Sequence, residues 1–179
     1  MYPARLAGRF AAVAVAALTL AGCATMNVSS YVERGVDLTQ YRTYNWAPAD
    51  QLATGDPRLD NNPFFQERVQ MAVERQLASR GFEKATAPDL LLHYHASVTQ
   101  DIYISGGERR DGYCDGCRPE VYDAGTLLID LVDARTNRLA WRGWAKSSID
   151  GVVDNQDWME QRIDEAVGRI LERLPHKLT

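Results

Sequence analysis

Residues 125–133, GTLLIDLVD, and residues 139–149, LAWRGWAKSSI, decide the fold. Apolar and polar side chains alternate in both stretches, as in strands with one buried face. The pattern predicts an antiparallel hairpin with Asn137 at a left-handed position in the turn. A slip of one residue would turn one apolar set to water, so the pattern also fixes the register. The residues expected on the buried face are Leu127, Ile129, Leu131, Leu139, Trp141, Gly143 and Ala145.

The opposite face of this hairpin carries the side chains most suited to binding. Asp130 and Arg142 are expected to pair across the two strands. Trp144 lies between Arg142 and Lys146 in the sequence, and Trp and Arg dominate binding hot spots. If helices cover the apolar face, these three residues form an exposed partner-binding surface. The alternative is that the N-terminal strand or the long loop before the hairpin covers Trp144.

Two amphipathic helices are predicted, one before the hairpin and one after it. Pro63 suits the first turn of the earlier helix, and Gly81 suits the left-handed position just after it. Asp157, with Glu160 three residues on, is expected to cap the later helix, which Pro175 stops. The apolar residues on the inner faces are Phe65, Val69, Val73, Leu77, Met159, Ile163, Ala166, Val167, Ile170, Leu171 and Leu174.

Three further strands are predicted. Residues 27–32 have modest strand character, and residues 41–46 are rich in aromatic and β-branched side chains. Residues 90–98 alternate in polarity and can run on to Ile104. Residues 105–120, rich in Gly, Arg, Asp and Pro, are predicted to be an irregular loop.

These elements predict an α+β fold, a two-layer sandwich. We expect a mostly antiparallel mixed sheet of four to five strands with two amphipathic helices packed on one face. The order along the chain is two strands, a helix, three strands and a helix.

The N-terminal segment has the layout of a secretory signal. Arg5 and Arg9 precede an apolar run that ends in Leu20-Ala21-Gly22-Cys23, which matches the box that lipoprotein signal peptidase recognises. The run is shorter than the roughly 20 residues that a membrane-spanning helix needs. We therefore expect a lipoprotein signal peptide at residues 1–22, with Cys23 lipidated. This expectation is favoured over a retained transmembrane anchor and over cleavage by the conventional signal peptidase. Residues 23–26 then form a tether to a single domain, residues 27–179.

Acyl chains on Cys23 would hold the protein permanently at a membrane, since two chains already anchor stably. Ala24 is not the aspartate that retains enterobacterial lipoproteins at the inner membrane. By its resemblance to that system, the chain is expected at the outer membrane, on its periplasmic face.

The charge balance argues against nucleic acid as a partner. The chain has 20 Lys and Arg and 24 Asp and Glu. Loss of Arg5 and Arg9 with the signal leaves 18 basic side chains and a net charge of −6. Nucleic-acid binding is driven by neutralisation of phosphates, which an acidic domain does not supply.

Cys114 and Cys117 remain once Cys23 is lipidated. In an oxidising compartment they are expected to form a disulfide. A thioredoxin-type pair would need a helix start that this loop does not favour. A metal site that also uses His93 and His95 would require the loop to fold back along the whole strand. We therefore predict no metal site, and keep a metal- or redox-linked module on this loop as the alternative function.

Catalytic signatures are missing from the sequence. No nucleophile elbow, metalloprotease helix or phosphate-binding loop is found. His93, His95 and Ser97 would project in parallel from one strand, so no nucleophile has a base within hydrogen-bond reach. We predict neither an enzyme nor a cofactor.

Three stretches together resemble a family of bacterial lipoproteins, the domain of unknown function numbered 4136. They are YRTYNW at residues 41–46, PDLLLHYH at residues 88–95, and GTLLIDLVD at residues 125–133 leading into WRGW at residues 141–144. The resemblance implies a cell-envelope lipoprotein with one α/β domain and no catalytic residues to transfer. With the signal and the Trp144 surface, it leads us to expect a non-catalytic lipoprotein that binds an envelope protein or cell-wall material.

Overall fold

The computed structural model describes residues 26–48, 52–106, 108–110 and 113–175, with the backbone alone at 108–110 and 113–115. The helices are α1 (Pro63–Ser79) and α2 (Gln156–Leu171). The strands are β1 (Asn27–Val32), β2 (Thr43–Trp46), β3 (Glu83–Lys84), β4 (Leu90–Ser105), β5 (Glu108–Arg110), β6 (Tyr113–Asp115), β7 (Arg118–Asp133) and β8 (Arg138–Ser148). A 3-10 turn at Leu38–Gln40 precedes β2.

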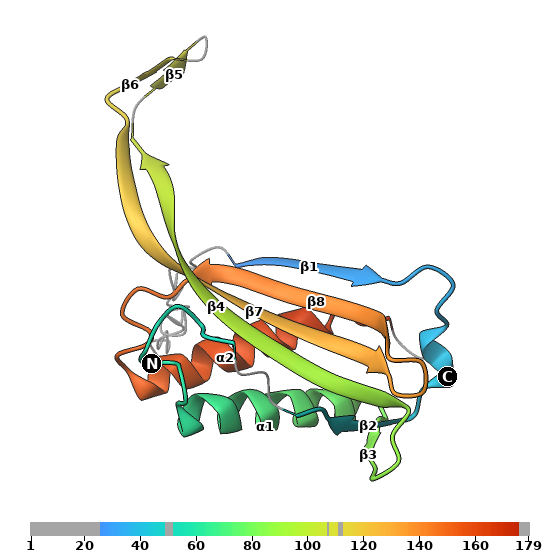
Figure 1. The fold of residues 1–179 in the computed structure, drawn as a ribbon. Helices are drawn as coiled ribbons and strands as arrows, with labels where there is room; N and C mark the ends of the chain where they lie inside the picture. Colours follow the sequence, from blue (N-terminus) through green and yellow to red (C-terminus); the bar gives the residue numbers. More distant parts are fainter. Residues whose placement is uncertain (1–25, 49–51, 107, 111–112, 176–179) are drawn as a thin grey trace, which may run out of the picture.

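The main sheet has the order β1-β8-β7-β4-β2-β3, and both helices lie on one of its faces (Figure 1). β2 runs parallel to β3 and β4, and the other neighbours are antiparallel. The predicted α+β two-layer sandwich is confirmed. The sheet has six strands where four to five were predicted, because β3 is a two-residue strand, too short for any alternation of polarity to mark it.

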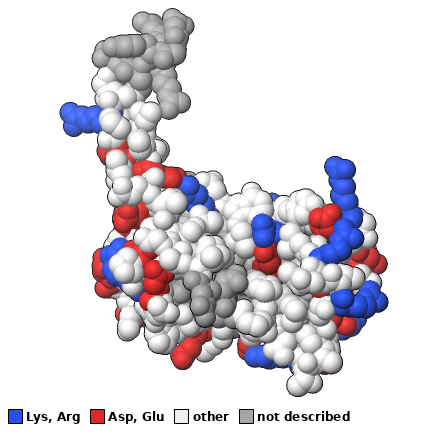
Figure 2. Space-filling model, viewed as in Figure 1, with Lys and Arg blue, Asp and Glu red and all other residues white. Residues whose placement is uncertain are grey.

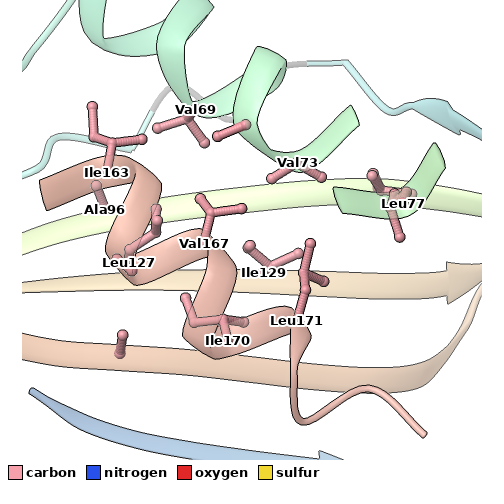
Figure 3. Packing of buried hydrophobic residues seen from close by; sticks show 14 of the residues in the cluster. Val69, Val73, Leu77, Ala96, Leu127, Ile129, Ile163, Val167, Ile170 and Leu171 are labelled. Carbon is pink, nitrogen blue, oxygen red and sulfur yellow. The ribbon is translucent and has the colours of Figure 1, made fainter. Parts of the chain in front are cut away.

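The core lies between the helices and the sheet (Figure 3). Side chains of α1 and α2 meet those of β4 and β7, and the apolar stripes predicted for both helices are buried. Burial of these side chains is the main force that holds the layers together. The residues labelled there are Val69, Val73, Leu77, Ala96, Leu127, Ile129, Ile163, Val167, Ile170 and Leu171.

The helix ends follow local chemistry. Asn62 accepts a hydrogen bond from the Phe65 N–H at 3.2 Å, directly before Pro63 at the first helical position. Gly81 has φ of 75°, as its predicted cap role requires. The cap predicted at Asp157 is wrong, because the Asn155 side chain accepts the Trp158 N–H at 3.0 Å. Both residue types cap helices well, and the pattern alone did not separate positions two residues apart.

The hairpin of β7 and β8 has the predicted register up to a β-bulge. Leu127, Ile129 and Leu131 pair with Ala145, Gly143 and Trp141. The register then shifts, and Leu139 pairs with Val132 on the other face. The placement of Leu139 on the buried face was therefore wrong. An inserted residue moves the strand from one face to the other, and both Ala140 and Trp141 are fully buried.

The predicted irregular loop at residues 105–120 is also wrong. β4 and β7 pair without interruption from Leu90–Asp133 to Ser105–Arg118, and β5 and β6 form a second small sheet beyond them. The far half of this ribbon leaves the sandwich and curves away from the helix layer (Figure 1). We call residues 100–123 the arm. Backbone groups pair across the ribbon at residues 100–105 with 118–123 and at residues 108–110 with 113–115, so a polar composition does not prevent strand formation.

Candidate interaction surface

The sheet face opposite the helices holds the predicted partner-binding residues. Trp144 is half-buried and pairs with Ser29 of β1 and Leu128 of β7. Arg142 and Lys146 lie on the same face, two residues to each side. No described helix covers this face (Figure 1), which we call the open face. β1 adds an edge strand beside Trp144 but does not lie over it.

Both cations beside Trp144 have carboxylate partners. Arg142 donates from Nε and Nη2 to the two carboxylate oxygens of Asp130, at 2.7 and 2.6 Å. This is the predicted cross-strand pair, and it raises the pKa of Arg142. Lys146 Nζ lies 2.7 Å from Asp101 Oδ2. The hydrogen bond from Lys146 lowers the pKa of Asp101. The surface is therefore a balanced polar frame around an aromatic ring, with its cations already paired.

His93 and His95 also lie on the open face, opposite Asp130 and Leu128 in the register. They border a groove of about 710 Å³ at the exposed edge of β4, past the end of β2. Trp46 and Tyr94 are further lining residues, with ring centroids 6.0 Å apart in an edge-to-face contact. Burial raises the pKa of the Tyr94 hydroxyl.

Contacts with α1 and the following strand orient the Trp46 ring. Its Nε1 donates to Glu74 Oε1 at 2.8 Å, and Lys84 Nζ donates to the same oxygen at 2.7 Å.

The cysteines and histidines lie at opposite ends of β4. Cys117 directly precedes β7 at the far end of the arm, and it is disulfide-bonded. From His93 to Ser105, twelve strand residues at about 3.3 Å each span about 40 Å. The pairs cannot share one ion. Among the described residues, no three His, Cys, Asp or Glu side chains gather in a way that would hold a metal.

Two predicted sites lie outside the described residues. They are Cys23, with the whole signal peptide at residues 1–22, and the side chain of Cys114. Lipidation and the pairing of Cys114 with Cys117 therefore stay predictions. In the described part of the chain, no helix is long and apolar enough to cross a membrane.

The arm exposes apolar side chains that the sequence pattern did not predict to be exposed. Its β4 half exposes Ile102, Tyr103 and Ile104, and its β7 half exposes Val121. The extension of the strand at residues 90–98 to Ile104 was predicted from this alternation, whereas its pairing with residues 118–123 of β7 was not.

The fold and the open sheet face define an α+β sandwich with a single helical layer. A family model for the domain of unknown function DUF4136 matches residues 28–176. The chain belongs to this family, as the three sequence stretches predicted. No curated protein matches the chain.

Solved structures resemble the chain at low sequence identity. A PDZ domain protein from Parabacteroides distasonis is 13% identical, with a TM-score of 0.55 over 84% of this chain. The chain spans only 36% of that protein's length, and the likeness shows the fold alone. The PelC dodecamer from Paraburkholderia phytofirmans is 9% identical over 82% of this chain and 96% of its own, with a TM-score of 0.47.

Proposed function

We propose that the chain is a non-catalytic cell-envelope lipoprotein, held at the periplasmic face of the outer membrane by lipids on Cys23. Its open face binds a periplasmic protein or cell-wall material through Trp144, Arg142 and Lys146. The observation that carries the binding role is a half-buried Trp144 framed by two ion pairs on a sheet face without a helical cover. The box at residues 20–23 carries the location.

The anchor is tested by labelling with radioactive palmitate. The wild-type chain is expected to take up label, and Cys23→Ala to lose it. Equal labelling of both proteins would contradict lipidation at this residue.

The binding surface is tested by crosslinking in cells from a photoreactive amino acid at Trp144. Trp158 is the matched control, because it is a Trp on α2 that is 56% exposed on the helix side. We expect a crosslinked species from position 144 that is absent from position 158. The same products from both positions, or none from 144, would reject the surface.

A second measurement leaves Trp144 itself free for substitution. With the photoreactive group at Ser29, the cross-strand neighbour of Trp144, the same species is expected. The further change Trp144→Ala should abolish it while the chain stays folded, because truncating a hot-spot Trp costs a large part of the binding energy.

A further inference from the structure

The arm continues the buried face of the sheet beyond the helices. The even-numbered residues of β4 from Leu90 to Ala96 lie on the sheet face that packs against the core. Ile102 and Ile104 are also even-numbered, so they lie on the same side of the strand. Val121 pairs with Ile102 and shares its side of the ribbon. Past the helices nothing described covers these side chains, and Ile102 and Val121 are 67% and 63% exposed. An apolar strip of this kind indicates a contact surface.

The start of β1 lies at the end of the sandwich from which the arm projects (Figure 1). Asn27 pairs with Lys146, whose Nζ reaches Asp101 of the arm at 2.7 Å. Only four residue steps separate Asn27 from Cys23, a reach of at most about 14 Å. An acylated Cys23 would therefore bring a bilayer to this end of the molecule.

The arm is longer than the tether. The six residues from Gln100 to Ser105 span about 20 Å at 3.3 Å each, and β5 and β6 extend the arm further. The anchor and the arm leave the same end of the sheet. A bilayer held within 14 Å of Asn27 therefore lies within the arm's reach.

The chemistry of the arm suits the interface of a bilayer and not its hydrocarbon interior. Tyr is enriched at this depth, and exposed apolar side chains such as Ile and Val gain free energy when a membrane interface removes them from water. Below the grey tip, the arm surface in view is white with one basic and several acidic side chains among the uncharged ones (Figure 2). Residues 108–115 contain five charged side chains, and a two-stranded ribbon leaves edge groups that hydrocarbon cannot satisfy.

From this placement we infer that the arm lies in the membrane interface, with Ile102, Ile104 and Val121 against the phospholipids of the leaflet that holds Cys23. The inference rests on the lipid anchor of the proposed function. The arm adds a second contact at the anchored end of the domain and fixes its orientation, so that the open face stands beside the bilayer, accessible from the periplasm.

The test uses the full chain in cells, with a photoreactive diazirine amino acid in place of Ile102. The matched control replaces Met71, an apolar side chain of α1 that is 53% exposed. After irradiation, phospholipid adducts are measured by mass, and palmitate labelling is measured on the same samples. We expect at least tenfold more phospholipid adduct from position 102 than from position 71.

Each other outcome overturns the inference. Equal adducts from the two positions, in a chain that carries palmitate, would reject the arm contact and leave the anchor standing. Adducts from position 102 to a second copy or to another protein in place of lipid would assign the strip to a protein interface. Loss of palmitate labelling would reject the anchor and the arm contact together.

A charge on the strip tests the role of its apolar character. With the diazirine at position 102, Ile104→Lys should lower the phospholipid adduct at least threefold and leave palmitate labelling unchanged. An unchanged adduct yield would show that the apolar strip does not hold the arm in the interface, and would overturn the inference.

Discussion

Gly143 of β8 lies where the Trp141 ring and α2 pack directly onto the sheet. A Cβ atom at this position would lie 2.3 Å from Cη2 of Trp141 and 2.7 Å from Cγ2 of Ile170. Trp141 and Ile170 are fully buried and have no room to move. We expect Gly143→Ala to lower the free energy of unfolding by about 1–3 kcal/mol, the usual cost of overpacking. Urea denaturation of the purified chain measures this change.

Gly168 of α2 provides the control for that substitution. The nearest atom to a Cβ there is Nε2 of Gln76, at 3.8 Å, so Ala fits without displacement. Because Ala is the better helix former, Gly168→Ala should raise the free energy of unfolding by about 0.5–1 kcal/mol. Equal effects of the two substitutions would contradict the packing argument.

At the scale of the element, the arm is separable from the sandwich. The β7–β8 pairing ends at Ala124 and Ser148, and the last β2–β4 pair is Trp46 and Leu92. We expect replacement of residues 101–122 by Asn-Gly to change the free energy of unfolding by less than about 1 kcal/mol. A two-stranded ribbon is marginally stable by itself, and the lost pair of Asp101 and Lys146 is a surface ion pair of small value.

A deeper cut is the control for this deletion. Removal of residues 99–124 also takes Ala124, which is 1% exposed and lies against the main sheet. This variant should be less stable than the shorter deletion in the same urea experiment. A large loss from the shorter deletion would show that the arm stabilises the sandwich.

The sandwich and the arm differ in how far their strands could be predicted from the sequence. Where a strand has one buried face, alternation marked it, as in residues 90–98 and 125–131. The arm has no buried face, so residues 105–120 had the composition of a loop while the ladder between β4 and β7 satisfied their backbone. Arg142, Trp144 and Lys146 lie on the sheet face that the alternation predicted. The ion pair of Lys146 with Asp101 was not predicted, because the register of that part of β4 depends on the arm.

At the scale of the whole molecule, two carboxylates join distant segments of the chain. The backbone N–H groups of Arg42 and Thr43 lower the pKa of Asp89. Asp133 is buried at the β7–β8 turn. The hydrogen bonds that these carboxylates accept are stronger in the ionised form.

Asp133 gives the clearest prediction of pH dependence. The Thr136 N–H donates to its Oδ1 at 2.7 Å, and the Tyr41 hydroxyl donates to its Oδ2 at 2.9 Å. These bonds lower the pKa of Asp133 below its ordinary value, with the Thr136 bond as the largest cause. A carboxyl whose pKa is lower in the folded state contributes stability above its unfolded pKa, near 3.9, and loses it as pH falls towards the folded value.

We therefore expect the wild-type chain to lose stability as pH falls below about 4, and Asp133→Asn to lose less over the same range. At pH 7 the variant should already be about 1–2 kcal/mol less stable, because an amide replaces a charged acceptor beside the Tyr41 hydroxyl. Urea denaturation of both proteins at pH 7 and pH 3 measures how much stability each loses as the pH falls. The control substitution is Asp150→Asn, because the contacts of Asp150 with Ser148 and Asp123 are exposed, and it should leave the pH dependence of the wild type unchanged. Parallel slopes for wild type and Asp133→Asn would show that this carboxylate does not link the folding of the molecule to pH.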